Sequence, residues 1–167
     1  MEDLEGYTCS CCGKWMVGLP FDYAYGEPYY WRSDLQGDPT SYLTSDVCVI
    51  EGRDYFLRGS VEVPVIGSNQ RFAWGIWVSL AKKNFDRAME LLDREERVAE
   101  PPYFGWFSNQ VDVYPDTLNL KTSVSARSLN ERFYVELEPT NHPLSLEQRN
   151  GMTLDRVREI AEKAARH

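Results

Sequence analysis

Apolar and polar residues alternate with a period of two along the middle of this chain, a pattern typical of β-strands. In residues 55–63, Tyr55, Leu57, Val61 and Val63 fall on one face, and the residues between them fall on the other. The same alternation recurs in residues 74–80, 118–124 and 133–137, and a short apolar run occupies residues 47–50. These segments predict a sheet of short strands connected by turns.

The pattern changes to a helical period in three places. Between residues 82 and 97, apolar residues are spaced i, i+3, i+4 and i+7, which places them on one face of a helix. A short helix is expected at residues 144–149, ended by Asn150 and Gly151, and Thr153 is placed to cap a last helix.

We therefore predict a single α+β domain over residues 1–167, with a mostly antiparallel sheet and helices on one face of it. The sheet is expected over residues 46–138 with one inserted helix, and the C-terminal helices over residues 143–167. Residues 21–45 and 100–106 are rich in Tyr, Pro and Gly without a clear period, so we predict loops there.

The composition is acidic, with 26 Asp and Glu against 18 Lys and Arg and a net charge of −8. Nucleic-acid binding depends on Lys and Arg neutralising phosphates, so we expect neither a nucleic-acid partner nor an anionic membrane. A basic protein partner would suit such a surface. Residues 1–5 lack the features of a signal peptide, and no apolar run is long enough to span a bilayer. We expect a cytoplasmic protein with reduced cysteines.

The strongest chemical signal is a cysteine cluster in residues 1–20. Cys9 and Cys12, followed by Gly13, have the spacing of half a zinc knuckle, in which both thiolates reach one ion at about 2.3 Å. We predict an N-terminal zinc-knuckle-like loop holding a structural zinc ion, with Cys48 as the third ligand. The fourth ligand is left open between Cys11, His142 and Asp46. The alternative is that the cysteines are reduced and some are simply buried.

His142 is the one histidine away from the C-terminus, so any Ser–His or Cys–His catalytic pair would have to use it. It lies in a turn-forming sequence near Glu138 and Glu147. A histidine in such a turn is more often a hydrogen-bonded loop residue than a general base. We therefore include these three residues as ligand-binding candidates and assign no catalytic residue.

The outward faces of the predicted strands add Asn119 and Lys121 to these candidates. Glu136 and Glu138 lie two residues apart on one face, where paired carboxylates could support acid–base chemistry. Ion pairs with Arg58 and Lys121 would explain these charges without a function. The aromatic clusters also leave two interpretations open: a groove for a sugar or peptide, or loops anchored to the core.

As a set, several segments resemble an uncharacterised bacterial family, domain of unknown function 2199. The resemblance rests on Tyr7-Thr8-Cys9-x-x-Cys12-Gly13, Leu19-Pro20, Pro28-Tyr29-Tyr30-Trp31, Ser45-Asp46-Val47-Cys48-Val49-Ile50, Trp74-Gly75-Ile76-Trp77-Val78-Ser79-Leu80, Glu100-Pro101-Pro102-Tyr103-Phe104-Gly105-Trp106, Leu118-Asn119-Leu120-Lys121-Thr122 and Glu136-Leu137-Glu138-Pro139-Thr140-x-His142-Pro143-Leu144. Many members carry a histidine four residues after the second cysteine, where this chain has Met16. A thioether is a weak zinc ligand, so the resemblance implies that this chain uses Cys11 or another group.

Three hypotheses follow for the function. We favour a non-catalytic binding or interaction domain with a structural zinc site, because a zinc ion held by four protein ligands has no open position for catalysis. The first alternative is a small hydrolase-like enzyme that uses His142 with Cys48 or nearby carboxylates. The second is an acidic inhibitor or immunity-type protein that occupies a basic partner.

Overall fold

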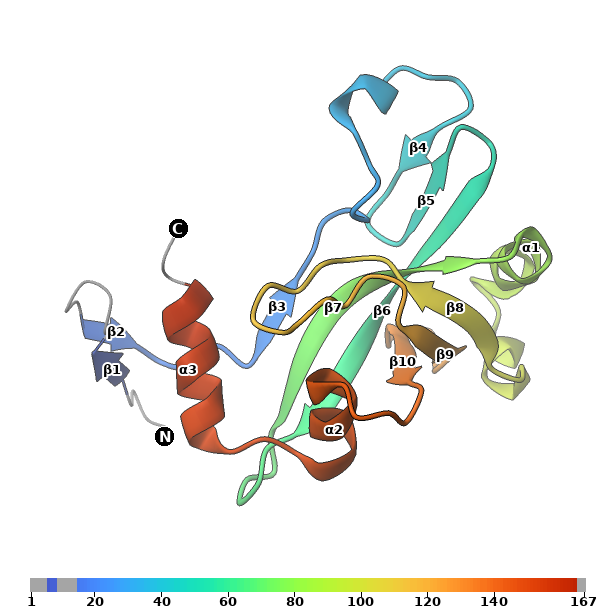
Figure 1. Ribbon diagram of the computed structural model, residues 1–167. Helices are drawn as coiled ribbons and strands as arrows, with labels where there is room; N and C mark the ends of the chain where they lie inside the picture. The colour runs from blue at the N-terminus through green and yellow to red at the C-terminus, as the bar shows by residue number, and fades with distance from the viewer. Residues whose placement is uncertain (1–5, 9–14, 165–167) are drawn as a thin grey trace.

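Five strands close into a barrel, which is the central feature of the computed structural model (Figure 1). The structure describes residues 6–8 and 15–164. The barrel strands are β6 (Asp54–Pro64), β7 (Arg71–Leu80), β8 (Tyr103–Phe107), β9 (Lys121–Ser125) and β10 (Phe133–Leu137). They pair in chain order, and β10 returns to pair with β6. Only this closing pair is parallel within the barrel, so the predicted α+β class and mostly antiparallel sheet are confirmed.

Three further strands extend the sheet outside the barrel. β3 (Asp22–Ala24) pairs with β7, β5 (Val47–Ile50) pairs with β6, and β4 (Tyr42–Leu43) pairs with β5. β3 and β4 lie in residues 21–45, where we predicted only loops, and that prediction is wrong. Both strands are too short to show a period in the sequence.

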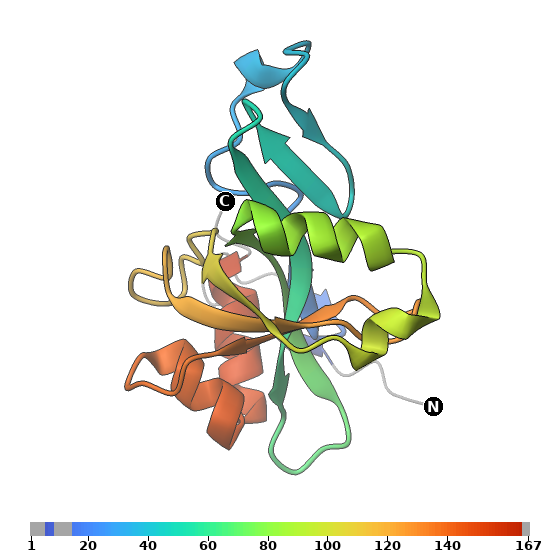
Figure 2. The ribbon, with the colours of Figure 1, turned by 90° about the vertical axis from the view of Figure 1, so that its right-hand side faces the viewer.

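The described helices are α1 (Lys82–Leu91), α2 (Pro143–Asn150) and α3 (Leu154–Ala164). α1 and α2 lie toward opposite ends of β6 (Figure 2), and α3 lies beside β3 (Figure 1). At the start of β6, the ring centroids of Phe85 on α1 and Tyr55 are 5.1 Å apart. At its end, just after α2, the Met152 N–H donates to the Pro64 carbonyl. The expectation of helices on one face is therefore wrong, because a sheet that closes on itself has an inside and two ends instead of a free face.

The predicted helices are otherwise confirmed with one change of length. The helix expected between residues 82 and 97 ends at Leu91, and a 3-10 helix, η2 (Glu95–Ala99), follows it. Gly151 ends α2 as expected, with a φ of 89° that glycine adopts without strain. The Thr153 hydroxyl accepts the Arg156 N–H at 3.1 Å and caps α3, also as expected.

The apolar positions identified from the alternation fill the barrel. Leu57, Val61 and Val63 of β6 are buried, as are Phe72 and Ile76 of β7. They form one hydrophobic cluster with buried side chains of all three helices. The sequence pattern therefore located the interior of the barrel, although it did not reveal the closure.

β8 is the strand that the sequence analysis missed. We predicted a loop over residues 100–106 because two prolines interrupt it. The prolines precede the strand, where they remove no ladder hydrogen bond, and Tyr103, Gly105 and Phe107 are buried on its inner side. The next strand, predicted over residues 118–124, begins only at Lys121, and its hairpin with β10 is confirmed.

Arg97 fastens the β9–β10 turn to the segment after α1. Its guanidinium donates to four carbonyl oxygens, those of Leu92, Arg127, Ser128 and Glu131, at 2.7 to 3.0 Å. The side chain is buried, and it also stacks on the Phe133 ring. A fork of N–H groups in one plane can satisfy several carbonyls at once, which the point charge of a lysine cannot do.

Closing the barrel requires a glycine at position 59. β10 pairs in parallel with β6 across Phe133 and Gly59. A Cβ atom at position 59 would lie 2.6 Å from Val135 Cγ2 and 3.0 Å from the Phe133 carbonyl oxygen. Since a methyl group cannot fit there without movement, glycine allows the close approach of the two strands.

We expect Gly59→Ala to lower the free energy of unfolding by about 2 kcal/mol, because the added methyl group pushes β10 away from β6. Urea denaturation measures the difference. Gly26→Ala is the matched control, since nothing lies within 4 Å of a Cβ built there. Its cost should stay below about 0.5 kcal/mol. Equal losses in the two variants would contradict the closure argument.

We expect Arg97→Lys to cost about 2 kcal/mol of stability, because it leaves several buried carbonyl oxygens without a donor. Hydrogen exchange should also show faster opening of the turn around residues 127–131. Arg94→Lys, at an exposed neighbouring arginine, controls for the substitution itself. A stability loss in Arg94→Lys as large as that in Arg97→Lys would refute the fastening role.

Candidate binding surface on the barrel

His142, the candidate base, has both ring nitrogens occupied by backbone groups. The Leu144 N–H donates to Nδ1 at 3.1 Å, which caps α2, and Nε2 donates to the Asp116 carbonyl at 3.0 Å. An acceptor at Nδ1 and a donor at Nε2 together require the neutral imidazole. His142 therefore fastens the loop after β8 to the start of α2, and it is not brought together with Cys48.

Glu147, the neighbouring candidate, belongs to a buried network that joins α2, α3 and β7. Its carboxylate accepts the Tyr114 hydroxyl at 2.7 Å and the Arg156 Nε at 2.8 Å. The Trp74 indole N–H in turn donates to the Tyr114 oxygen at 3.2 Å. Burial, followed by the charge of Glu147, raises the pKa of Tyr114 well above its usual value. No buried polar atom of this network lacks a hydrogen-bond partner, which accounts for Glu147 by structure alone.

Cys48, the predicted third zinc ligand, lies in a second, smaller hydrophobic cluster. It is completely buried beside Ile50, Phe56 and Trp77 on the outward side of β5, β6 and β7. Burial, with a smaller contribution from the Glu27 carboxylate, raises the pKa of its thiol to about 12.

The other predicted ligands, Cys9, Cys11 and Cys12, lie outside the described residues. The strands on either side of them, β1 (Gly6–Thr8) and β2 (Trp15–Val17), form a separate hairpin that is drawn well away from β5 (Figure 1). In residues 6–8 and 15–164, no three His, Cys, Asp or Glu side chains gather in a way that could hold a metal ion. The zinc site stays a prediction.

Two large aromatic side chains project from the outer side of β8. Phe104 and Trp106 are 47% and 40% exposed, although they lie in the middle of the sheet, and their ring centroids are 4.9 Å apart at an interplanar angle of 89°. The residues that alternate with them point into the barrel. Exposed aromatics packed against each other on a rigid strand are a common feature of binding surfaces.

Strand register places Trp106 in a row of residues that crosses four strands. Phe56, Ser79, Trp106 and Lys121 are successive cross-strand partners on β6, β7, β8 and β9, so they share the outer face. Three strand spacings make this row about 14 Å long. Glu138 continues it, since its N–H donates to the Lys121 carbonyl.

Two hollows flank Trp106 along this row. The first has a volume of about 590 Å³, and Ser79, Asn119 and Tyr30 are among the residues that line it. The second has a volume of about 340 Å³ and includes Phe104 and Lys121 in its lining. Three of our five ligand-binding candidates, Asn119, Lys121 and Glu138, therefore line the hollows of this surface.

Tyr29 and Tyr30 extend the surface beyond β8. The Tyr29 N–H donates to the Ser108 carbonyl at 2.8 Å, which holds this loop at the end of the strand. The two tyrosine rings meet edge to face, and Tyr30 also stacks on Phe56. We call the surface formed by Tyr29, Tyr30, Phe104, Trp106, Lys121, Glu136 and Glu138 the aromatic face.

The charged side chains of the aromatic face are not engaged in ion pairs. Within the described part of the chain, the side chains of Lys121, Glu136 and Glu138 form no ion pair. The cross-strand pairs that we expected with Arg58 and Lys121 are therefore wrong. Arg58 donates to the Ser45 carbonyl instead. The second hollow thus has two free carboxylates at its edge.

The clusters of aromatic residues are evident in the sequence, but their arrangement on one face is not. The missing signal was the alternation of Tyr103, Gly105 and Phe107 with Phe104 and Trp106, which identifies a strand with an aromatic outer side. This alternation was overlooked because residues 100–106 were interpreted as a loop.

Comparisons with known proteins give a family and no activity. No curated protein and no solved structure matches this chain significantly. No helix in the described ranges is long and apolar enough to cross a membrane. A family model described as an uncharacterized protein conserved in bacteria, domain of unknown function 2199, matches residues 8–152. Because that match covers most of the sequence, the chain belongs to this bacterial family.

Proposed function

We propose that this protein is a non-catalytic binding module that holds a positively charged polypeptide segment of a protein partner on its aromatic face. The observation that carries the proposal is the exposed Phe104–Trp106 pair beside the free carboxylates of Glu136 and Glu138. A lysine or arginine side chain placed there gains a cation–π contact and a charge-assisted hydrogen bond together.

The dimensions of the aromatic face suit an extended chain. At about 3.3 Å per residue, a row of about 14 Å accommodates four residues of an extended peptide. Alternate side chains of such a peptide would enter the two hollows on either side of Trp106. Sugar rings, in contrast, stack on flat platforms, and the perpendicular rings of Phe104 and Trp106 provide a poor one.

The overall charge favours a cationic partner. A net charge of −8 attracts basic segments over a distance and repels nucleic acids. Such attraction mainly raises the association rate, and it weakens as salt is added. An acidic inhibitor of a basic protein would use the same contacts, so that hypothesis is a special case of this proposal.

The hydrolase hypothesis has less support. A general base needs a free lone pair within reach of a nucleophile, and both nitrogens of His142 are engaged with backbone groups. Glu147 is likewise engaged with Tyr114 and Arg156. These contacts favour binding over catalysis as the role of the domain.

An array of ten-residue peptides of random sequence tests the proposal. We expect the protein to select peptides with Lys or Arg next to an apolar residue, and Trp106→Ala to weaken that binding about tenfold or more. The double variant Glu136→Lys/Glu138→Lys should shift the preference toward acidic peptides, because it reverses the charge of the second hollow.

Two controls complete this experiment. Glu95→Lys/Glu96→Lys makes the same change of net charge on η2, away from the aromatic face, and should preserve the preference for basic peptides. Leu154→Ala removes a partly exposed apolar side chain from α3 and should leave binding unchanged. If the η2 variant also reversed the preference, net charge would explain selection and the aromatic face would have no specific role.

We further propose that the N-terminal cysteines hold a structural zinc ion. The support is the spacing of Cys9 and Cys12, followed by Gly13. Metal analysis of the purified protein should find one zinc per chain, and Cys9→Ser should release it and lower the melting temperature. With Cys48 as third ligand, Cys48→Ala should also release zinc. If Cys48→Ala retained zinc, all ligands would lie in the N-terminal segment. If Cys9→Ser retained zinc, the proposed zinc site would be contradicted.

A further inference from the structure

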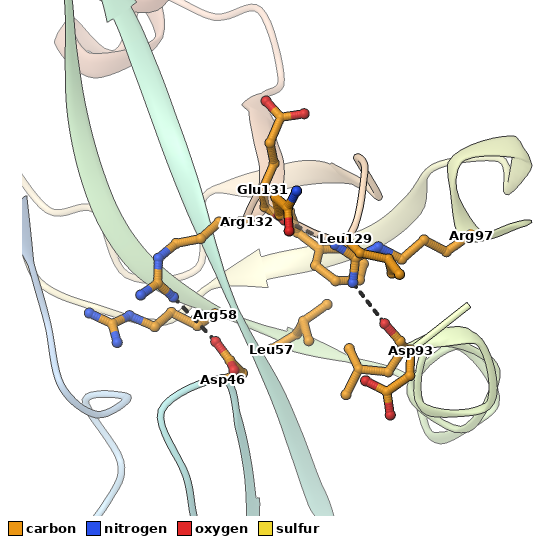
Figure 3. A pocket seen from close by; sticks show the side chains of 11 residues that line it. Asp46, Leu57, Arg58, Asp93, Arg97, Leu129, Glu131 and Arg132 are labelled. Atoms are coloured by element: carbon orange, nitrogen blue, oxygen red, sulfur yellow. Dashed lines mark hydrogen bonds and ion pairs between the residues drawn. The ribbon is translucent and has the colours of Figure 1, made fainter. Parts of the chain in front are cut away.

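A cavity of about 450 Å³ lies between β6 and the β9–β10 turn, on residues that the aromatic face does not use (Figure 3). Arg58 and Arg132 are among the residues that line it, and their guanidinium groups lie side by side next to the Asp46 carboxylate in Figure 3. The side chains of Glu131 and Asp93 point away from this pair in Figure 3. The lining as a whole has three acidic and three basic side chains, but two positive charges meet one negative charge around the Asp46 carboxylate.

Arg58 has an incomplete set of hydrogen bonds. Its Nη1 donates to the Ser45 carbonyl at 3.1 Å, but its buried Nε has no partner among the described residues. Leaving a buried donor unpaired is unfavourable, and more so for a charged group. Burial, and then the like charge of Arg132, lowers the pKa of Arg58, and Asp46 only partly opposes this effect.

Other arginines of the molecule show how such groups are normally satisfied. Arg127 pairs with Glu62 at 3.0 Å, and Arg156 pairs with Glu147 at 2.8 Å. The buried Arg97 has four carbonyl acceptors. Arg58 has neither arrangement, although carboxylates outnumber cations in this protein. Because Nε is closed off from solvent, an acceptor from outside the chain would pair with Nη2, for which the described residues supply no acceptor.

We propose that Arg58 and Arg132 bind the oxyanion group, carboxylate or phosphate, of a small molecule. Guanidinium groups bind both oxyanions through paired N–H donors. The ion pair between Arg132 and Asp46, at 3.3 Å and largely exposed, is weak enough for an incoming anion to replace. The cavity is as large as many small-molecule sites, and Leu57 and Leu129 also line it. The bound molecule therefore has room for an apolar part.

Nuclear magnetic resonance of arginine Nε–H groups tests this site on the full chain. Inorganic phosphate, acetate and octanoate are titrated separately at constant ionic strength. We expect at least one of them to shift the Arg58 Nε–H signal in a saturable manner. Tighter binding of octanoate than of acetate assigns an apolar carboxylic acid, and tighter binding of phosphate assigns a phosphate-bearing ligand.

Matched variants make the result specific. Arg58→Met and Arg132→Gln should each weaken anion binding at least fivefold, measured by calorimetry, while Asp46→Asn should strengthen it at least threefold by removing the competing carboxylate. Arg158→Gln and Asp155→Asn alter a comparable ion pair on α3 and should change nothing.

The proposal is overturned if no anion shifts the Arg58 signal, or if the Arg132 and Asp46 variants behave like the α3 controls. Weaker binding by Asp46→Asn would also overturn it, because that result would make Asp46 a ligand and not a competitor. Arg132 and Asp46 are both exposed, so these two tests hold even if Arg58→Met does not fold.

Discussion

The parallel pairing of β10 with β6 is the constraint on which the rest of the structure depends. It turns five strands that follow one another in the chain into a closed ring, and it is possible because Gly59 lets Phe133 approach. Closure removes the two edges that these strands would otherwise expose. Closure also gives every strand an inner and an outer side. Every second residue points inward and must be apolar, while the outward residues between them can be polar or can bind a ligand.

The outer surface of the barrel is covered in one part and exposed in another. β4, β5 and the segment around η1 (Ser33–Leu35) cover part of it, and the small cluster with Cys48, Phe56 and Trp77 fills the space beneath. The outer sides of β8, β9 and β10 have no such cover in the described residues, yet β8 carries Phe104 and Trp106 there. Exposed aromatics at these positions add nothing to the core, which is why we propose that they serve in recognition.

The sequence predicted the features that depend on residues close together in the chain, such as buried strand faces and helix ends. It did not predict the closure of the barrel. Alternation on β6 and β7 gave the buried faces, and the Thr153 cap and Gly151 gave the limits of the C-terminal helices. The ring itself depends on residues 59 and 133, which are far apart in sequence, so no local pattern reports it. β8 was missed because its prolines suggested a loop, and Arg97 because a buried arginine held by carbonyls has no pattern at all.

The two proposed sites have opposite charge requirements, and the barrel keeps them distinct. Phe56 lines the first hollow of the aromatic face and Arg58 lines the second site, two residues further along the outer side of β6. A basic peptide is attracted to Glu136 and Glu138 but repelled by the arginine pair, and the reverse holds for a small anion. Because closure fixes the register of every strand, the distance between the two sites stays the same when either ligand binds. Each therefore selects its ligand by charge on a surface that the same strand holds rigid.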